Sequence, residues 1–278
     1  MSLRKPEPVL VADRFPALLE ALLDLLESLS PEDWQRPVHD GAWTVKDLAQ
    51  HLLGDEINIL SGKRDQYHES LGPIESWDDL VDFINRRNAL WVEATRRMSP
   101  PLIYELLRIT GEQASAFFQS LDMFAAGGPV DWAGPGPAPV WLDVAREFTE
   151  RWHHQQHIRQ AVGKPGAMEP YFLAPVLAAF VRALPVAVSD FSAPVGAALT
   201  LHISGDSGGD WTVVHEQHGW ELYAGRPDHP HAQVELPQEI AWQLFTRGIS
   251  PELARGHARL SGDLSLAGKV LETVSIIA

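Results

Sequence analysis

Residues 43–53 read Trp-Thr-Val-Lys-Asp-Leu-Ala-Gln-His-Leu-Leu. Thr44 with Asp47 three positions later has the pattern of a capping box, which starts a helix. The apolar residues that follow recur at helical spacing, so one side of this helix is predicted to be buried. His51 lies about two turns into the helix among leucines. We therefore expect its ring near the buried side rather than in solvent.

Helical periodicity extends on both sides of this segment. Residues 11–29 have apolar side chains at the i, i+3, i+4 and i+7 positions of an amphipathic helix. Ser76 has the residue type of an N-cap for a third helix. Pro100-Pro101 interrupts the pattern, and a fourth, shorter helix is predicted over 102–121.

The middle of the chain contains the strongest helix signal. A Gly/Pro/Ala stretch at 127–139 is predicted to hold no regular element. A helix is then predicted over 140–162, ending at the Gly-Lys-Pro-Gly of residues 163–166. A further apolar helix is expected at about 170–188.

After Pro194 the pattern changes to short β-prone segments separated by turn residues. These predicted strands are 198–204, 211–216, 220–224, 233–236 and 257–261, with helices at 238–247 and 265–275. The predicted fold class is therefore an up-and-down four-helix bundle followed by a small α+β domain. Its predicted divisions are a helical domain at 1–168, a connecting helix at 169–194 and an α+β domain at 195–278.

The amino-acid composition excludes several classes of partner and active site. The 278 residues include 22 Lys and Arg against 37 Asp and Glu, a net charge of −15. Such a chain repels phosphate backbones, so we expect no nucleic-acid partner. There is no cysteine, which excludes disulfides, thiolate metal sites and a cysteine nucleophile. No secretory signal is visible, and prolines and an arginine interrupt the most apolar stretch. We expect a cytoplasmic protein without a membrane span.

Residues 149–157 read Thr-Glu-Arg-Trp-His-His-Gln-Gln-His and hold the densest set of potential metal ligands. On a helix, residues four positions apart are neighbours. Glu150 and His154 form one such pair, and His153 and His157 form another. These residue types are also consistent with a polar helix face that binds nothing.

His51 favours the metal-site interpretation because it lies in a different helix from Glu150 and His154. Inward-facing side chains from different helices build the metal sites of helix bundles. With Glu150 and His154, His51 would complete a set of two histidines and one carboxylate. Such a set leaves zinc a coordination position for water or substrate, as in catalytic sites. Nickel, manganese and iron accept the same donors.

Two arginines, Arg151 and Arg159, lie on the same predicted helix. One interpretation is that they contact an acidic substrate or a cofactor. The other is that they are solvated charges that balance Glu147 and Glu150.

The sequence resembles a known family in three places. Trp43-Thr44-Val45-Lys46-Asp47-Leu48-Ala49-Gln50-His51-Leu52 resembles the second-helix motif of the DinB-like superfamily, and more narrowly that of the mycothiol-dependent maleylpyruvate isomerase N-terminal domain. The segment from Glu150 to Arg159 is similar to that family's Glu-x-x-x-His metal motif. The segment from Ala258 to Leu264 is similar to the sterol-carrier-protein-like domain that often follows.

The resemblance implies a metal held by His51, Glu150 and His154. Other DinB-like proteins use His-x-x-x-His on this helix, which His153 and His157 would satisfy. The resemblance also implies a low-molecular-weight thiol cofactor such as mycothiol and a small electrophilic substrate. The metal would be zinc or alternatively nickel, and the protein a monomer or homodimer.

The function that follows is transfer of the thiol to the electrophile, or its cis–trans isomerisation. Two alternatives remain open: a non-catalytic module that binds a metal or small ligand, and a metal-dependent hydrolase. The hydrolase ranks last because the chain lacks the His-Glu-x-x-His of zinc peptidases.

Overall fold

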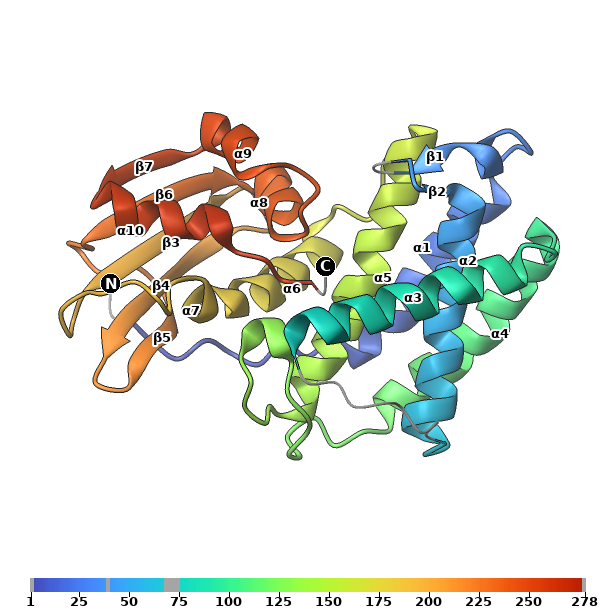
Figure 1. The fold of residues 1–278 in the computed structure, drawn as a ribbon, viewed down its shortest axis with the longest axis horizontal. Coiled ribbons are helices and arrows are strands. Elements are labelled where there is room, and N and C mark those ends of the chain that lie inside the picture. Colours follow the sequence, from blue (N-terminus) through green and yellow to red (C-terminus); the bar gives the residue numbers. More distant parts are fainter. Residues whose placement is uncertain (1–2, 39–40, 68–75, 277–278) are drawn as a thin grey trace. The chain divides into compact units, whose positions relative to one another are not determined.

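The computed structural model describes residues 3–38, 41–67 and 76–276 (Figure 1). The chain divides into two compact units. The helical unit consists of Ala12–Leu121 and Glu150–Ala167. The sheet unit consists of the N-terminal stretch up to Val11, Asp122–Thr149 and Met168–Ile276.

The elements of the helical unit are the helices that the first part of the sequence predicts and two short strands that it does not predict. They are α1 (Phe15–Glu27), β1 (Pro37–Val38), β2 (Trp43–Thr44), α2 (Val45–Asn58), α3 (Trp77–Thr95), α4 (Pro100–Gln119) and the part of α5 (Val140–Val162) from Glu150 onward. The helix starts match the cap residues. The Thr44 hydroxyl oxygen accepts from the Asp47 backbone N–H, and the Thr44 backbone N–H donates to the Asp47 carboxylate. Ser76 accepts from the backbone N–H of Asp79.

The core of the helical unit lies between these helices. Its buried residues come from α1, the β1–β2 region, α2, α4 and the end of α5: Leu22, Leu25, Leu26, Trp34, Val38, Val45, Leu48, Ala49, Leu52, Leu53, Ile103, Leu107, Ile158 and Val162. Burial of each large aliphatic side chain contributes roughly 1.5–3 kcal/mol. Helix α2 packs against both α3 and α4, so its apolar side is covered and His51 is carried inward with it.

Some details of the helical unit differ from the sequence prediction. The fourth helix begins at Pro100 and has 20 residues, whereas α3 has 19, so the prediction of a shorter helix was wrong. Proline is tolerated in the first turn because its missing N–H has no partner there anyway. After α2 the chain also continues as a π-helical turn, Ile59–Arg64, which apolar periodicity does not distinguish from an α-helix.

The sheet unit is built on one mixed sheet. Its elements are the first turns of α5, α6 (Pro170–Phe180), α7 (Leu184–Ala187), β3 (Ala198–Ser204), β4 (Gly209–Glu216), β5 (Gly219–Ala224), β6 (Ala232–Pro237), α8 (Gln238–Phe245), α9 (Pro251–His257), β7 (Arg259–Gly262) and α10 (Leu264–Gly268). The strand order is β5-β4-β3-β6-β7. Among the described strands of this sheet, β3 and β6 pair in parallel and the other neighbours pair antiparallel. Helices α8 and α10 both contact β6.

The apolar segment before the sheet is a core element. Within the described residues, Pro170–Ala187 is the one window whose length and composition would suit a membrane span. It is broken into α6, a 3₁₀ turn and α7. Its side chains fill the interior of the sheet unit, where Phe180 packs edge-to-face on Phe245. The guanidinium of Arg182 lies over the Trp141 ring at 5.0 Å, and burial lowers its pKa to about 10.

The chain is thus a helical N-terminal region followed by a sheet domain. The up-and-down bundle, the sterol-carrier-like fold and the division points at 168 and 194 stay predictions.

Candidate metal centre

His51 is placed by the helix start that precedes it. The β1–β2 pairing sets Val38 opposite Trp43 immediately before α2. The capping box then begins α2, and His51 lies two turns further with its side chain only 5% exposed. The Trp43 ring lies 5.2 Å from the imidazole ring. This packing restricts the rotation of the His51 ring and directs Nε2 toward α5.

Helix α5 carries the other two predicted ligands. Glu150 and His154 are one turn apart, and His154 Nε2 lies 2.8 Å from Glu150 Oε1. Two side chains of the following turn attach α5 to α1, because Gln155 donates to the carbonyl of Leu18 and Arg159 donates to that of Ala21. The helix thus holds its polar side toward α2.

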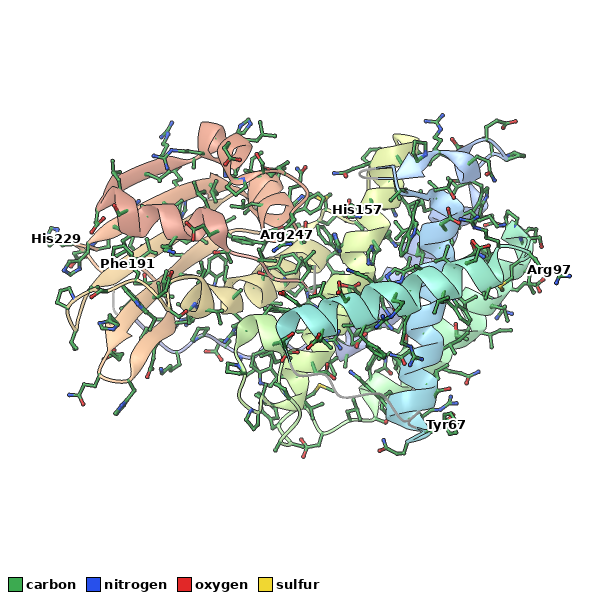
Figure 2. The ribbon with its side chains drawn as sticks, in the orientation of Figure 1. Tyr67, Arg97, His157, Phe191, His229 and Arg247 are labelled. Carbon is green, nitrogen blue, oxygen red and sulfur yellow. The ribbon has the colours of Figure 1, made fainter. Side chains whose placement is uncertain are left out.

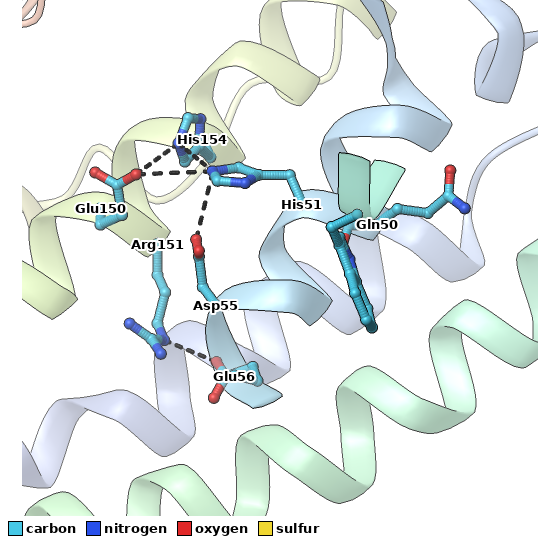
Figure 3. A network of polar contacts seen from close by, with 8 residues as sticks. Gln50, His51, Asp55, Glu56, Glu150, Arg151 and His154 are labelled. Atoms are coloured by element: carbon cyan, nitrogen blue, oxygen red, sulfur yellow. Dashed lines mark hydrogen bonds and ion pairs between the residues drawn. The ribbon is translucent and has the colours of Figure 1, made fainter. Parts of the chain in front are cut away.

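The three side chains converge on one point (Figure 3). His51 Nε2 lies 3.1 Å from His154 Nε2 and 3.8 Å from Glu150 Oε1. Ligand atoms around a tetrahedral ion with bonds of about 2.0–2.1 Å lie about 3.3–3.4 Å apart. The observed separations bracket that spacing, so these residues fit a single divalent metal without rearrangement of the backbone.

The electrostatics of the centre favour a cation. Burial raises the pKa of Glu150, but the charges and hydrogen bonds of His154 and His51 outweigh burial and hold it well below its ordinary value. Burial lowers the pKa of His51, but Asp55 and Glu150 outweigh it and raise that pKa overall. The raised pKa of His51 favours its protonated, positively charged form, so the carboxylates around it favour positive charge at this point.

Asp55 belongs to the same network, although the sequence analysis did not single it out. Its Oδ2 lies 3.4 Å from His51 Nε2. Burial and the charge of Glu150 raise the pKa of the Asp55 carboxyl to about 6, although His51 acts in the opposite direction. The available signal was its position four residues after His51 on a predicted helix.

A buried ion pair lies next to the centre. Arg151 Nε donates to Glu56 Oε1 at 2.7 Å, and the two side chains are 9% and 7% exposed (Figure 3). The Arg151 guanidinium also lies over the rings of Phe15 and Phe118. Of the two interpretations of Arg151, the one that makes it a solvated charge was therefore wrong, because this residue connects α5 to α2.

The second histidine pair is arranged differently. His153 and His157 lie one turn apart on α5 with ring centroids 4.3 Å apart, and Figure 2 shows His157 on that helix. Their donor atoms form a close group with His154. Among the described residues, the close group that contains His51 is completed by Glu150 and His154, not by this pair.

Comparison with known proteins places this geometry in a family. The family model described as the mycothiol maleylpyruvate isomerase N-terminal domain matches residues 15–159. A solved variant of a mycothiol-dependent maleylpyruvate isomerase matches with a TM-score of 0.52 and 10% identity, covering 90% of this chain and 92% of that chain. Another structure of a mycothiol-dependent maleylpyruvate isomerase gives 0.49 and 12%, covering 85% and 88%. No curated protein sequence matches.

At these identities the structural likeness shows a shared fold and no more. The family match is stronger, because it spans more than half of the chain and includes all three converging residues. The chain belongs to the mycothiol maleylpyruvate isomerase N-terminal domain family.

Proposed function

We propose that this chain is a metal-dependent enzyme that uses a low-molecular-weight thiol, such as mycothiol, to isomerise or S-conjugate a small electrophile in the cytoplasm. The observation that carries the proposal is the convergence of His51, Glu150 and His154 on one point. It is supported by membership of a family named for a mycothiol-dependent isomerase. The preferred metal is zinc, with nickel as the alternative.

The donor set suits thiol chemistry. His51, Glu150 and His154 would hold the divalent metal, which when bound would lower the pKa of a thiol at a remaining coordination position and so supply a thiolate at neutral pH. The chain contains no cysteine, so this thiol must come from a small molecule. That requirement agrees with the cofactor in the family's name.

The protein's own residues supply orientation and charge. Trp43 restricts the ring of His51, and Glu150 neutralises one of the positive charges gathered at the centre. The Arg151–Glu56 pair holds α5 against α2, so the ligands on the two helices keep their separation. Prealigned ligands lose little conformational entropy when the metal binds.

The first experiment measures metal content by elemental analysis of the purified protein. We expect about one equivalent in the wild type, and loss of the metal in His51→Ala, Glu150→Ala and His154→Ala. His153→Ala is the matched control, since its ring lies on the same helix outside the His51 group. If His153→Ala loses the metal and Glu150→Ala retains it, the metal site is formed by the His153/His157 pair instead. No metal after reconstitution would overturn the proposal and favour a metal-free binding module.

The second experiment tests the reaction. The loaded protein is mixed with mycothiol and maleylpyruvate, and loss of the cis substrate is followed by absorbance and chromatography. We expect conversion that needs both the thiol and the metal, with His51→Ala inactive. A panel of other electrophiles distinguishes isomerisation from S-transfer, because transfer consumes one thiol per turnover. Metal binding without thiol-dependent turnover of any electrophile would contradict the enzymatic part of the proposal.

A further inference from the structure

We propose that the open edge of β7 is a self-association surface, on which a second copy of this chain pairs its own β7 antiparallel around a two-fold axis. The strand order makes β5 and β7 the two edges of the sheet, and Figure 1 shows β7 at its outer edge. The chain itself covers part of the β5 edge, because Arg4 and Ala224 exchange both backbone hydrogen bonds, at 3.1 and 2.8 Å. Among the described residues, β6 is the one strand that pairs with β7.

The backbone of β7 presents hydrogen-bonding groups to this edge. Asp263 donates its N–H to the carbonyl of His231, which directly precedes β6. The C=O of a trans peptide points away from its N–H, so the Gly262 carbonyl points away from β6. Inward and outward positions alternate along an antiparallel strand, so the Leu260 N–H also points outward. Such groups at an open edge are a template for one more strand.

The charges on β7 are complementary to those of a second copy. Arg259 lies two positions before Ser261, and Asp263 lies two positions after it. In an antiparallel pair centred on Ser261, each copy therefore places Arg259 opposite the other copy's Asp263. A two-fold interface requires this reciprocity, since every contact occurs twice. The Leu260 N–H then meets the carbonyl of the second copy's Gly262.

The two charged side chains are available for this contact. Arg259 and Asp263 are both exposed. Arg259 forms no ion pair among the described residues, although Glu235 is its neighbour on β6. Asp263 uses Oδ1 to cap α10, by accepting from the backbone of the first turn, which leaves Oδ2 for an arginine. Each copy can thus supply one donor and one acceptor.

Local charge distinguishes this edge from the rest of the surface. The net charge of −15 opposes self-association over most of the chain. Residues 252–263 instead hold two arginines and two carboxylates, so the edge is locally neutral. Leu264, which is 55% exposed, adds apolar surface next to the strand. This edge is therefore a place where two copies can meet with little repulsion.

The size of the contact sets the expected strength. Two strands of four residues each form a small interface. Interfaces below about 1,200 Å² are typical of weak complexes, so we expect a dissociation constant on the order of micromolar or higher. The experiment is sedimentation equilibrium of the full chain from about 1 to about 300 µM, a range that brackets such a constant. The wild-type mass should rise toward that of two chains.

Charge variants test whether β7 is the surface. Arg259→Glu places a carboxylate opposite the second copy's Asp263, twice, so the association constant should fall about 10-fold. Asp263→Asn removes the attraction but keeps a capping residue for α10, so we expect a fall of about 3-fold. The matched control is Arg226→Glu, which makes the same change in charge directly after β5, at the opposite edge of the sheet. It should associate like the wild type.

Hydrogen exchange locates the contact. The Leu260 amide should exchange more slowly at the highest concentration than at the lowest in the wild type, and equally at both in Arg259→Glu. A wild type that keeps the mass of one chain at every concentration overturns the proposal. So do equal effects of Arg259→Glu and Arg226→Glu, or association without slower exchange at Leu260. If circular dichroism shows that Arg259→Glu does not fold, Asp263→Asn decides, and unchanged association in that variant overturns the proposal.

Discussion

The buried pair of Glu56 and Arg151 is predicted to be a main support of the centre. In Glu56→Gln the guanidinium keeps its place but loses the carboxylate 2.7 Å away. Removal of one partner from a buried pair typically costs about 3–5 kcal/mol, because a buried charge is left uncompensated. The rings of Phe15 and Phe118 still face the Arg151 cation. We therefore expect the lower end, about 3 kcal/mol of unfolding free energy.

The chain contains a matched control on its surface. Arg108 and Glu112 form an i, i+4 pair on α4 at 3.3 Å, with side chains 48% and 61% exposed. Glu112→Gln removes the same type of charge, but in solvent such a pair contributes only about 0–1 kcal/mol. The two variants thus differ chiefly in the burial of the pair.

The assay is urea denaturation of the metal-free protein followed by far-ultraviolet circular dichroism and by tryptophan fluorescence. Coincidence of the two curves tests whether unfolding is two-state, which two compact units do not guarantee. The double variant Glu56→Leu/Arg151→Met replaces the pair by apolar side chains, and we expect its stability near that of the wild type. The reasoning is refuted if Glu56→Gln lies within about 0.5 kcal/mol of Glu112→Gln.

Three further predictions concern α2. Burial raises the pKa of the Asp55 carboxyl from 3.8 to about 6. Between about pH 4 and 6 the folded metal-free protein therefore holds a proton that the unfolded chain has lost, so the free energy of unfolding falls as the pH rises through this range. Asp55→Asn lacks this loss and should be about 1–2 kcal/mol more stable at pH 7 with a chelator present; equal pH profiles would contradict this. Gly54→Ala should destabilise by about 1–3 kcal/mol in urea titrations, since the new Cβ would lie 2.8 Å from the rigid indole of Trp91; a gain in stability would show that the two helices separate freely. Thr44→Ala should cost about 1 kcal/mol, because the reciprocal contacts with Asp47 disappear, and an unchanged denaturation midpoint would count against the cap.

Much of the fold followed from local sequence. The prediction of a helix over 140–162 was confirmed as α5, and the strand at 198–204 was confirmed as β3. Both segments have strong periodicity between clear turn residues. The prediction missed an element where local signals were weak: α9 (Pro251–His257) is a seven-residue helix that the sequence analysis did not predict. Short elements depend on packing by neighbours more than on their own propensity.

The candidate centre was likewise predicted only in part from the sequence. Glu150 and His154 could be paired from sequence, because residues four positions apart on one helix are neighbours on its surface. That rule applies equally to His51 with Asp55, but a lone aspartate after a histidine has no distinguishing pattern. Likewise nothing local indicates that Arg151 pairs with a residue 95 positions earlier rather than with solvent.

The amino-acid sequence by itself determined which segments are helices, where capped helices begin, and which side chains share a helix face. These properties depend on backbone geometry and on neighbours within one or two turns. Only the tertiary structure decided that His51 meets His154 across 103 positions of chain and that the Glu56–Arg151 pair is buried beside them. Those contacts depend on how α2 and α5 pack through the shared core, and packing is set by all the side chains between the helices together rather than by any local pattern.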